Sequence, residues 1–563
     1  MGNKGNCVGQ SVCSYEETME ALSSLITRRI RGDGSNRVGK FGLMFKYVKV
    51  LGLEDDLPKL KVIHIAGTKG KGSTCTFSEA ILRECGFRTG LFTSPHLIDV
   101  RERYRINGLD VSEEKFLQYF WDCWNQLKEN VTEDLPMPTL FQFLSLLAFK
   151  IFISEKVDVA ILEVGLGGKL DSTNVVKEPV VCGITSLGMD HMEILGDTLG
   201  KIASEKAGIF KPRVPAFTVP QLSEAMDVLQ ERASELMSSL EIALPLDPEN
   251  LNGMKLGLAG DHQFINAGLA VALCRCWLQK TGHSEEFDTN MLIKQGKLLP
   301  EAFLKGLSTA ALPGRAQIVH DESVKSDKSS ESEENTYGDL IFYLDGAHSP
   351  ESMEACARWF SHAVSENKYA NKGEKDGEFV RSEKIQYDCK NLDGSDKISK
   401  RILLFNCMEV RDPQQLLPQL FHTCASHGVH FSKAIFVPSI STYHKVDSGS
   451  SAIPIDTSKD VSWQATLQRT WERIIHGKDA ISNGSLKTEN SLKLPSNGFA
   501  HGKFSQKCNF EEKQFNCSAI IPSLPLTIKW LRDCAKENPS IRVQVLVTGS
   551  LHLVGDVLKL LRR

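Results

Sequence analysis

HIAGTKGKGSTC, residues 64–75, joins two segments with different hydrophobic patterns. The run before and into it, KVIHIAG (61–67), is short and β-prone, and it ends in glycine. STCTFSEAILRECG (73–86) has the pattern of a helix that ends at its final glycine. A glycine-rich turn between a strand and a helix is the setting of a phosphate-binding loop.

The glycines of this loop let backbone N–H groups converge on an anion, and the following helix adds partial positive charge. Lys71 can neutralise phosphate oxygens, and Lys69 is either a second cation or a solvated side chain. The usual spacing puts a hydroxyl directly after the lysine. Here Gly72 follows Lys71, and Ser73 comes one position late. The pattern predicts nucleotide binding by an unusual loop, against the alternative of a glycine-rich turn without a ligand.

Further apolar runs predict more strands of buried parallel sheets. VDVAILEVG (157–165) and PVVCGITSLG (179–188) are separated by helical patterns, as in βαβ units, and LIFYLDGAHS (340–349) restarts the pattern. We therefore predict an α/β protein of two domains. Residues 1–308 form a phosphate-loop ATPase-like parallel sheet with helices on both faces, and residues 309–563 form a smaller Rossmann-like α/β domain.

Three polar stretches interrupt the second half, at about residues 321–338, 363–399 and 446–515. They are rich in Ser, Asn, Lys, Asp and Glu, so we expect solvated insertions outside any packed core.

The bulk composition excludes several classes of protein. A net charge of -4 provides no basic field for nucleic acid. The 15 cysteines form no C-x-x-C pair, which argues against a disulfide framework or a zinc site and favours a reducing compartment. The N-terminus has neither signal-peptide nor transit-peptide character, so we expect a cytoplasmic protein. TLFQFLSLLAFKIFI (139–153) is interrupted by polar residues and predicts a buried helix, not a membrane span.

Polar side chains follow the predicted strands. Glu163 ends one strand, where a carboxylate can hold Mg²⁺ facing the phosphates. Its alternative role is an N-terminal cap for a helix after Gly167-Gly168. His191 lies beyond the next strand, where metal ligation and a structural role are equally open. Lys206 has small apolar neighbours, and its spacing alone favours a surface lysine whose stem covers them.

These segments, in this order, resemble the folylpolyglutamate synthase family of the Mur ligase superfamily. The resemblance covers most of residues 20–360 and, more weakly, the last strand segments. G-K-G-S is that family's own form of the phosphate loop, which accounts for the late hydroxyl. The matching motifs are GTKGKGS (67–73), LFTSPHLIDVRERYRING (91–108), LEVGLGGKLDSTN (162–174), TSLGMDHMEILGDTLGKIASEKAGIFK (185–211), LPGRAQ (312–317) and LDGAHSPES (344–352).

The resemblance implies roles that spacing does not reveal. Lys71, Lys206 and His348 are implied to be catalytic: Lys206 matches a lysine that is carbamylated in many members, and His348 is expected near the incoming glutamate. Ser349 stands where bacterial members usually have Asn, so the resemblance leaves the detail of the glutamate contacts open. The residues implied in ATP binding are Thr68, Lys69, Gly70, Lys71, Gly72, Ser73, Asn266, Arg315 and Asp345.

Two magnesium ions are implied as well. Ser94 and Glu163 match the residues that bind the ion between the β and γ phosphates, and His191 matches a ligand of a second ion. A monovalent cation such as K⁺ also fits the resemblance. The loop from Ser94 and the helix from Thr139 are similar to elements that border the pterin pocket, and the active site is expected between the two domains.

The implied reaction is ATP-dependent addition of L-glutamate to the γ-carboxyl group of tetrahydrofolate and its polyglutamates, through an acyl phosphate, with release of ADP and phosphate. Dihydrofolate synthase, which joins dihydropteroate to glutamate, is the alternative on the same scaffold. A nucleotide-regulated binding module without catalysis is disfavoured because Glu163, His191 and Lys206 occur together. We expect a monomer without nucleic-acid partners, and a mitochondrial location, in the matrix or at the inner membrane, is the alternative to the cytoplasm.

Overall fold

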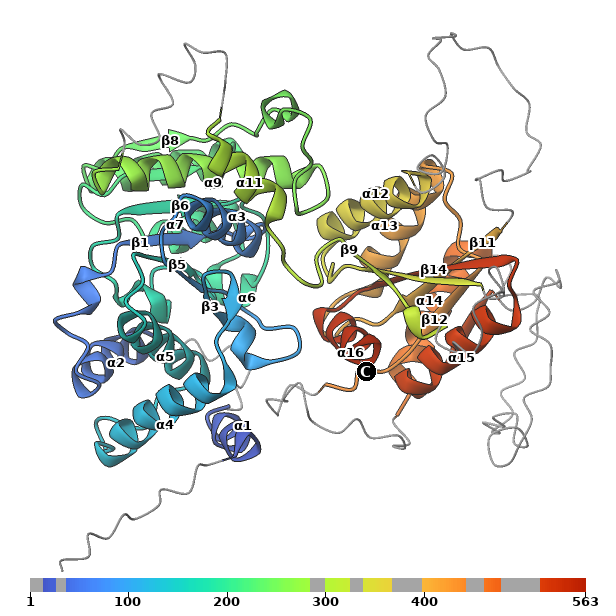
Figure 1. The fold of residues 1–563 in the computed structure, drawn as a ribbon, viewed down its shortest axis with the longest axis horizontal. Coiled ribbons are helices and arrows are strands. Elements are labelled where there is room, and N and C mark those ends of the chain that lie inside the picture. The colour runs from blue at the N-terminus through green and yellow to red at the C-terminus, as the bar shows by residue number, and fades with distance from the viewer. Residues whose placement is uncertain are drawn as a thin grey trace, which may run out of the picture. The chain divides into compact units, whose positions relative to one another are not determined.

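The computed structural model forms two compact units, one ending at Leu312 and the other starting at Pro313 (Figure 1). Both contain a sheet with helices, which agrees with the predicted two-domain α/β class. No helix among the described residues is long and apolar enough to cross a membrane. The structure describes residues 14–26, 37–283, 299–324, 338–366, 397–441, 460–476 and 517–562.

The first unit is built on a sheet with the strand order β4-β3-β2-β5-β1-β6-β7-β8. The strands from β2 to β8 in this order run parallel, as predicted, whereas β3 pairs antiparallel with β2 and β4 antiparallel with β3. The predicted parallel sheet is therefore confirmed from β2 to β8 in this order, and β3 and β4 add an antiparallel edge to it. The strands are β1 (Val62–Ala66), β2 (Thr89–Phe92), β3 (Tyr104–Ile106), β4 (Leu109–Asp110), β5 (Val159–Glu163), β6 (Val181–Ile184), β7 (Ala216–Thr218) and β8 (Leu240–Ile242).

Helices cover both faces of this sheet, as Figure 1 shows. The α-helices described in the first unit are α1 (Tyr15–Ser24), α2 (Arg37–Val50), α3 (Lys71–Glu84), α4 (Glu113–Glu129), α5 (Leu140–Ser154), α6 (Met192–Leu195), α7 (Leu199–Ala207), α8 (Ser223–Glu235), α9 (His262–Lys280) and α11 (Glu301–Thr309). Short 3₁₀ turns lie at η1 (Leu57–Lys59), η2 (Val100–Arg103), η3 (Ser172–Val175) and η4 (Pro248–Leu251).

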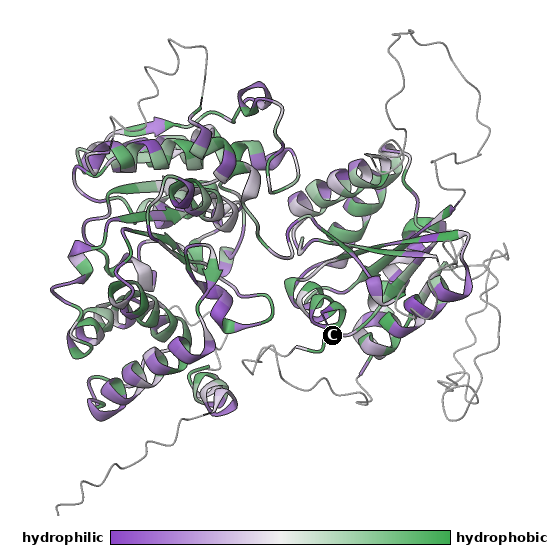
Figure 2. Cartoon of the chain, viewed as in Figure 1, coloured by the Kyte–Doolittle hydropathy of each residue, from purple (hydrophilic) through white to green (hydrophobic). Residues whose placement is uncertain are grey.

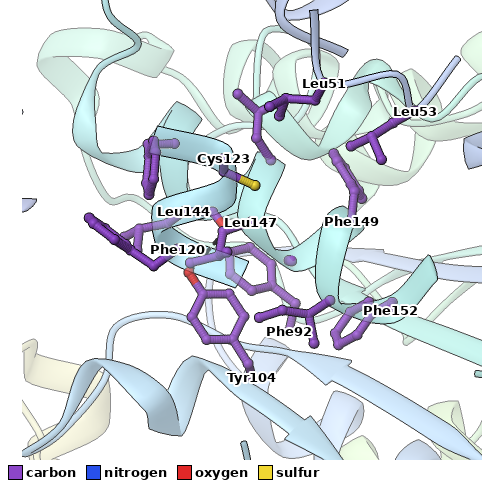
Figure 3. Packing of buried hydrophobic residues seen from close by; sticks show 14 of the residues in the cluster. Leu51, Leu53, Phe92, Tyr104, Phe120, Cys123, Leu144, Leu147, Phe149 and Phe152 are labelled. Atoms are coloured by element: carbon purple, nitrogen blue, oxygen red, sulfur yellow. Dashed lines mark hydrogen bonds between the residues drawn. The ribbon is translucent and has the colours of Figure 1, made fainter. Parts of the chain in front are cut away.

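Side chains alternate along β5 between two hydrophobic clusters, one on each face of the sheet. Ala160 and Leu162 belong to a cluster with α1, α2, α4 and α5, whereas Val159 and Ile161 belong to a cluster with α3, α9 and α11. Successive residues of a strand point to opposite faces, so a continuous apolar run predicts burial on both sides. Figure 3 shows the first cluster, in which aromatic side chains of β2, α4 and α5 pack together.

Helices α4 and α5 differ in how their apolar residues are spaced along the sequence. In α4, Phe116, Phe120, Cys123 and Leu127 recur at helical spacing and are buried, whereas α5 is buried along most of its length. Figure 2 shows the corresponding contrast between the hydrophilic colour on α4 and the hydrophobic colour of α5. The predicted buried helix at residues 139–153 is therefore confirmed as α5.

The second unit has a sheet with the order β13-β12-β11-β14-β10-β9, parallel except for β9, which pairs antiparallel with β10. Its strands are β9 (Gln317–His320), β10 (Asp339–Leu344), β11 (Ile398–Phe405), β12 (Lys433–Phe436), β13 (Ser518–Ile520) and β14 (Ile541–Thr548). The helices described in this unit are η5 (Glu322–Val324), α12 (Pro350–Glu366), α13 (Pro413–Ser426), α14 (Ser462–His476), α15 (Leu524–Glu537) and α16 (Leu551–Leu561).

Helix α14 corrects one of the predicted insertions. It lies inside the stretch 446–515, yet Trp471 is buried against Phe421 and Phe431, with ring centroids 5.7 and 6.1 Å away. The helix was not predicted because the composition of the whole stretch is polar, although a few apolar residues within it recur at helical spacing. Residues 325–337, 367–396, 442–459 and 477–516, which make up most of the three predicted insertions, lie outside the described residues.

Candidate active site

The loops that carry the predicted nucleotide residues leave neighbouring strands of the first unit. The strands β2, β5, β1 and β6 are adjacent and parallel, so their carboxyl ends meet at one edge. The phosphate loop follows β1, Ser94 follows β2, Glu163 ends β5, and His191 follows β6. The carboxyl edge of a parallel sheet is the usual ligand site of such folds.

The phosphate loop approaches its neighbours so closely that it depends on glycine. Gly70 has φ 88°, and a Cβ there would lie 2.1 Å from Asn266 Oδ1. A Cβ at Gly67 would lie 1.8 Å from Thr185 Oγ1. Helix α3 starts directly after Gly70, so its first N–H groups face the loop. Asn266, predicted from a distant motif, is thereby placed against the phosphate loop.

Hydrogen bonds fix the loop to the segment after β6. The N–H groups of Thr68 and Lys69 donate to Ser186 O at 3.0 and 3.1 Å. Lys69 Nζ lies 3.2 Å from Asp190 Oδ2, and Lys71 Nζ donates to Gly67 O at 3.1 Å. These bonds hold both cations of the loop at the sheet edge.

Glu163 lies beside the loop and is nearly inaccessible, at 4% exposed. Its Oε2 accepts a hydrogen bond from Ser94 N–H at 2.9 Å, and a Cβ at Gly72 would lie 3.5 Å from the same oxygen. The structure thus brings Glu163, Ser94 and the phosphate loop together. The alternative role as a helix cap is wrong, because Asp171 caps η3 and accepts from Thr173 N–H.

His191 occupies a more open position. It is the residue before α6, with φ 51°, and its side chain is 47% exposed. Its ring Nδ1 lies 3.9 Å from Glu193 Oε1, and its ring Nε2 lies 4.0 Å from Asp190 Oδ1. The described part of the chain contains no group of three or more His, Cys, Asp or Glu side chains that could hold a metal ion. Oxygen ligands from a hydroxyl and from nucleotide phosphates would therefore have to complete a metal site.

Lys206 is buried at the same site, so the surface position favoured by its spacing is wrong. It is 4% exposed, and its Nζ donates to Gly67 O at 2.7 Å. Burial, together with the charges of Lys71 and Lys69, lowers the pKa of the Lys206 ammonium to about 7. A large share of this amine is therefore neutral near pH 7.

The remaining predicted residues gather on one loop system of the second unit. Asp345 follows β10, and its carboxylate accepts from the N–H groups of Ala316 and Ala347 at 2.9 and 3.0 Å. A Cβ at Gly346 would lie 3.1 Å from an Arg315 guanidinium nitrogen. His348 Nδ1 lies 2.8 Å from Gly346 O. The unexpected Ser349 contacts Ser352 Oγ at 3.0 Å, where it helps to start α12.

A buried chain of hydrogen-bonded polar side chains links β1 to the segment after β5, and it was not predicted from the sequence. Asp171 accepts from the N–H groups of Gly165 and Leu166 at 3.1 and 3.0 Å and from Thr173 Oγ1 at 2.7 Å. His64 Nε2 lies 2.9 Å from that hydroxyl, and burial lowers the pKa of His64 to about 3. The available signal was the run LDSTN, in which an acidic residue and hydroxyls follow a glycine turn.

Fold and site define a class: two-unit α/β proteins with a phosphate loop at the carboxyl edge of the first sheet. A folylpolyglutamate synthase from Arabidopsis thaliana is 60% identical over 98% of this chain and 88% of its own length. A mitochondrial folylpolyglutamate synthase from Bos taurus is 36% identical over 97% of this chain and 92% of its own length. No protein-family model matches.

A solved structure supports the fold independently. Mycobacterium tuberculosis folylpolyglutamate synthase, complexed with ADP and AMPPCP, superimposes with a TM-score of 0.63 at 20% identity and covers 97% of this chain and 99% of that one. The chain belongs to the folylpolyglutamate synthase family, as the sequence motifs predicted.

Proposed function

We propose that this protein adds L-glutamate to the γ-carboxyl group of tetrahydrofolate and of its polyglutamates, with cleavage of ATP to ADP and phosphate. The observation that carries the proposal is the grouping of Glu163, Ser94 and Lys206 around the phosphate loop in a chain of this family. The relatives' name supports the substrate class, and the mycobacterial complex with ADP and AMPPCP supports ATP as the co-substrate.

A carboxylate is a poor electrophile at neutral pH, so the reaction requires activation. Transfer of the γ-phosphoryl group of ATP to the folate carboxylate forms an acyl phosphate and ADP. The amino group of glutamate then attacks the carbonyl carbon, the C–O bond to phosphate breaks, and the amine loses a proton. Lys71 and the N–H groups at the start of α3 are suited to hold the phosphates during the first step.

The donors present fit magnesium. Glu163 offers a carboxylate next to the phosphate loop, and Ser94, whose N–H contacts that carboxylate, carries a hydroxyl. Mg²⁺ prefers oxygen ligands from one or two carboxylates, waters and phosphates. We assign Glu163 and Ser94 to the ion at the β and γ phosphates and His191 to a second ion. Bound magnesium would neutralise charge on the transferring phosphoryl group.

Lys206 fits the carbamylation implied by the family resemblance. Only a neutral amine attacks CO₂, and the lowered pKa of Lys206 makes this form accessible near pH 7. The carbamate would turn a buried cation into an anion facing Gly67, Lys69 and Lys71. In the second unit, we assign Arg315 and Asp345 to ATP and His348 to the incoming glutamate.

The remaining assignments are a monomeric state, an optional K⁺ ion and a cytoplasmic location. A mitochondrial location is the alternative, and the name of the bovine relative supports it. Fluorescent fusions at the C-terminus of the complete gene product, viewed with a mitochondrial marker, decide between the two compartments.

One assay tests the activity. Purified protein is incubated with ATP, magnesium, labelled glutamate and either tetrahydrofolate or dihydropteroate. We expect label in tetrahydrofolate polyglutamates with one ADP released for each glutamate added. Label only in a dihydropteroate product would identify a dihydrofolate synthase. Folate binding without ADP release would identify a binding protein without catalysis.

A further inference from the structure

Helix α1 contacts the loop that carries Ser94, although the two contacting residues are 84 positions apart in the chain. The Tyr15 hydroxyl donates to Asp99 Oδ1 at 2.6 Å, and the Arg101 guanidinium lies 5.5 Å from the centroid of the Tyr15 ring. Burial beside Asp99 raises the pKa of the Tyr15 hydroxyl. Tyr15 therefore remains a hydrogen-bond donor at physiological pH.

The helix that presents Tyr15 is itself attached to the body of the first unit. Met19 and Leu22 are buried in the cluster drawn in part in Figure 3. Trp121 Nε1 donates to Thr18 Oγ1 at 3.0 Å, and Leu140 N–H donates to Leu25 O at 3.1 Å. These contacts place α1 against α4 and α5, so Tyr15 projects from a fixed support.

The contacted loop is internally ordered by carboxylates. Glu102 accepts from the N–H groups of Leu97, Ile98 and Asp99 at 2.7–3.1 Å. Asp99 caps η2 by accepting from Arg101 N–H at 2.9 Å. The loop is therefore one hydrogen-bonded body, which the Tyr15 hydroxyl holds from outside.

This loop leads directly into the candidate site. Its first residues are anchored by Thr93 N–H, which donates to Arg103 O at 3.2 Å, and by Ser94 N–H, which donates to Glu163 Oε2 at 2.9 Å. Glu163 in turn lies against Gly72 of the phosphate loop. A displacement of the loop would remove the Ser94 N–H, a donor that contacts the Glu163 carboxylate directly.

We infer that Tyr15 is a positioning residue: its hydrogen bond to Asp99 fixes the loop from Ser94 to Glu102 and thereby holds Glu163 against the phosphate loop. The inference rests on the proposed function for its kinetic consequence. Helix α1 thus influences Glu163, which is distant from it in the sequence, through the loop from Ser94 to Glu102.

The test uses the full chain with Tyr15→Phe, which keeps the ring under Arg101 and removes only the hydroxyl. Hydrogen exchange of the peptide 94–103, measured by mass spectrometry without nucleotide, should accelerate about tenfold, as expected for loss of a hydrogen bond to a charged group. The kcat for glutamate addition should fall about tenfold, and the magnesium concentration for half-maximal rate should rise.

Tyr119→Phe is the matched control. Tyr119 in α4 also donates to a carboxylate, Glu155 Oε1, at 2.9 Å, but Glu155 lies at the end of α5, away from the loop. We expect wild-type exchange of peptide 94–103 and wild-type kcat in this variant. Asp99→Asn, which keeps an acceptor oxygen for Tyr15, should lose less activity than Asp99→Ala.

Three results would overturn the inference. The first is unchanged hydrogen exchange of peptide 94–103 in Tyr15→Phe. The second is accelerated exchange in Tyr15→Phe together with a wild-type kcat. The third is a loss of kcat in Tyr119→Phe as large as the loss in Tyr15→Phe. If the unmodified chain adds no glutamate, the proposed function fails instead, and the exchange measurement still decides whether Tyr15 holds the loop.

Discussion

Lys71 is the cation that the phosphate loop supplies from the first residue of α3. Its Nζ donates to Gly67 O and Thr68 O, so the ammonium lies over the loop itself. We expect Lys71→Ala to lower kcat about a thousandfold or more, because positioned charge is often the largest catalytic contribution. Circular dichroism should show an intact fold.

Lys69→Ala is the matched control for this prediction. Lys69 pairs with Asp190 at 3.2 Å and its side chain is 35% exposed, so its charge is screened by solvent. A smaller loss of kcat is expected. Near-normal rate and ATP affinity in Lys71→Ala would contradict the assignment of the phosphate loop.

Glu163 and His191 should differ in their effect on magnesium. Glu163 brings a full negative charge beside the phosphate loop, whereas His191 is half-exposed and neutral when it binds metal. Glu163→Ala should lose about a thousandfold in rate, and His191→Ala about a hundredfold. Rates measured against magnesium concentration test both variants. Wild-type magnesium affinity and rate in Glu163→Ala would remove Glu163 from the metal site.

Lys206 contributes to the unfolding free energy in a pH-dependent way, and the sign of this contribution follows from its lowered pKa. The folded chain holds this group with a pKa of about 7, against 10.5 as the ordinary value. Between these values the unfolded state binds more protons, so the unfolding free energy rises with pH from about 7 to about 10 and gains nothing below 7. Urea unfolding in CO₂-free buffer should show this slope, and Lys206→Met should lack it.

The same variant pair tests carbamylation. At pH 8, added bicarbonate should raise the activity of the wild-type protein and leave Lys206→Met unchanged. A wild-type slope of stability with pH in Lys206→Met would show that another group titrates, and the predicted state of Lys206 would be wrong.

At the scale of elements, α14 (Ser462–His476) is a packed helix inside residues 446–515, the stretch that the sequence predicted to be an insertion. Its Trp463 Nε1 donates to Cys407 O at 2.7 Å, and its Trp471 is fully buried. Trp471→Ala should cost about 3–5 kcal/mol of unfolding free energy, as large-to-small changes in cores do. Deleting the whole stretch should therefore prevent folding of the second unit.

A shorter deletion should be tolerated. Helix α14 ends at His476, and the Nε2 atom of His476 lies 3.6 Å from Cys517 Sγ. Because these two residues are close in space, we expect that a short Gly/Ser linker can replace residues 480–512. We expect wild-type urea unfolding and ligase activity from this variant. Loss of soluble protein would mean that the removed residues belong to the fold.

Element prediction from sequence worked where the signal was local. The phosphate loop, its strand and its helix are contiguous, and Glu163 and His191 follow apolar runs, so each was recognisable from a short window. The antiparallel strands β3 and β9 were missed because pairing direction depends on distant partners. The burial of Lys206 and the contact of Tyr15 with Asp99 also arise only from tertiary packing, which no spacing rule reports.

At the scale of the whole molecule, the catalytic roles that the family resemblance implies fall on residues of both units, so chain stoichiometry becomes testable. We expect a monomer of 62.5 kDa in sedimentation. Lys71→Ala in the first unit and His348→Ala in the second should each be inactive, because the family resemblance implies a catalytic role for each residue. If one chain must supply both residues, mixing the two variants restores nothing. Recovery of activity on mixing would require exchange of parts between chains, and it would replace the monomer by an oligomer with shared sites.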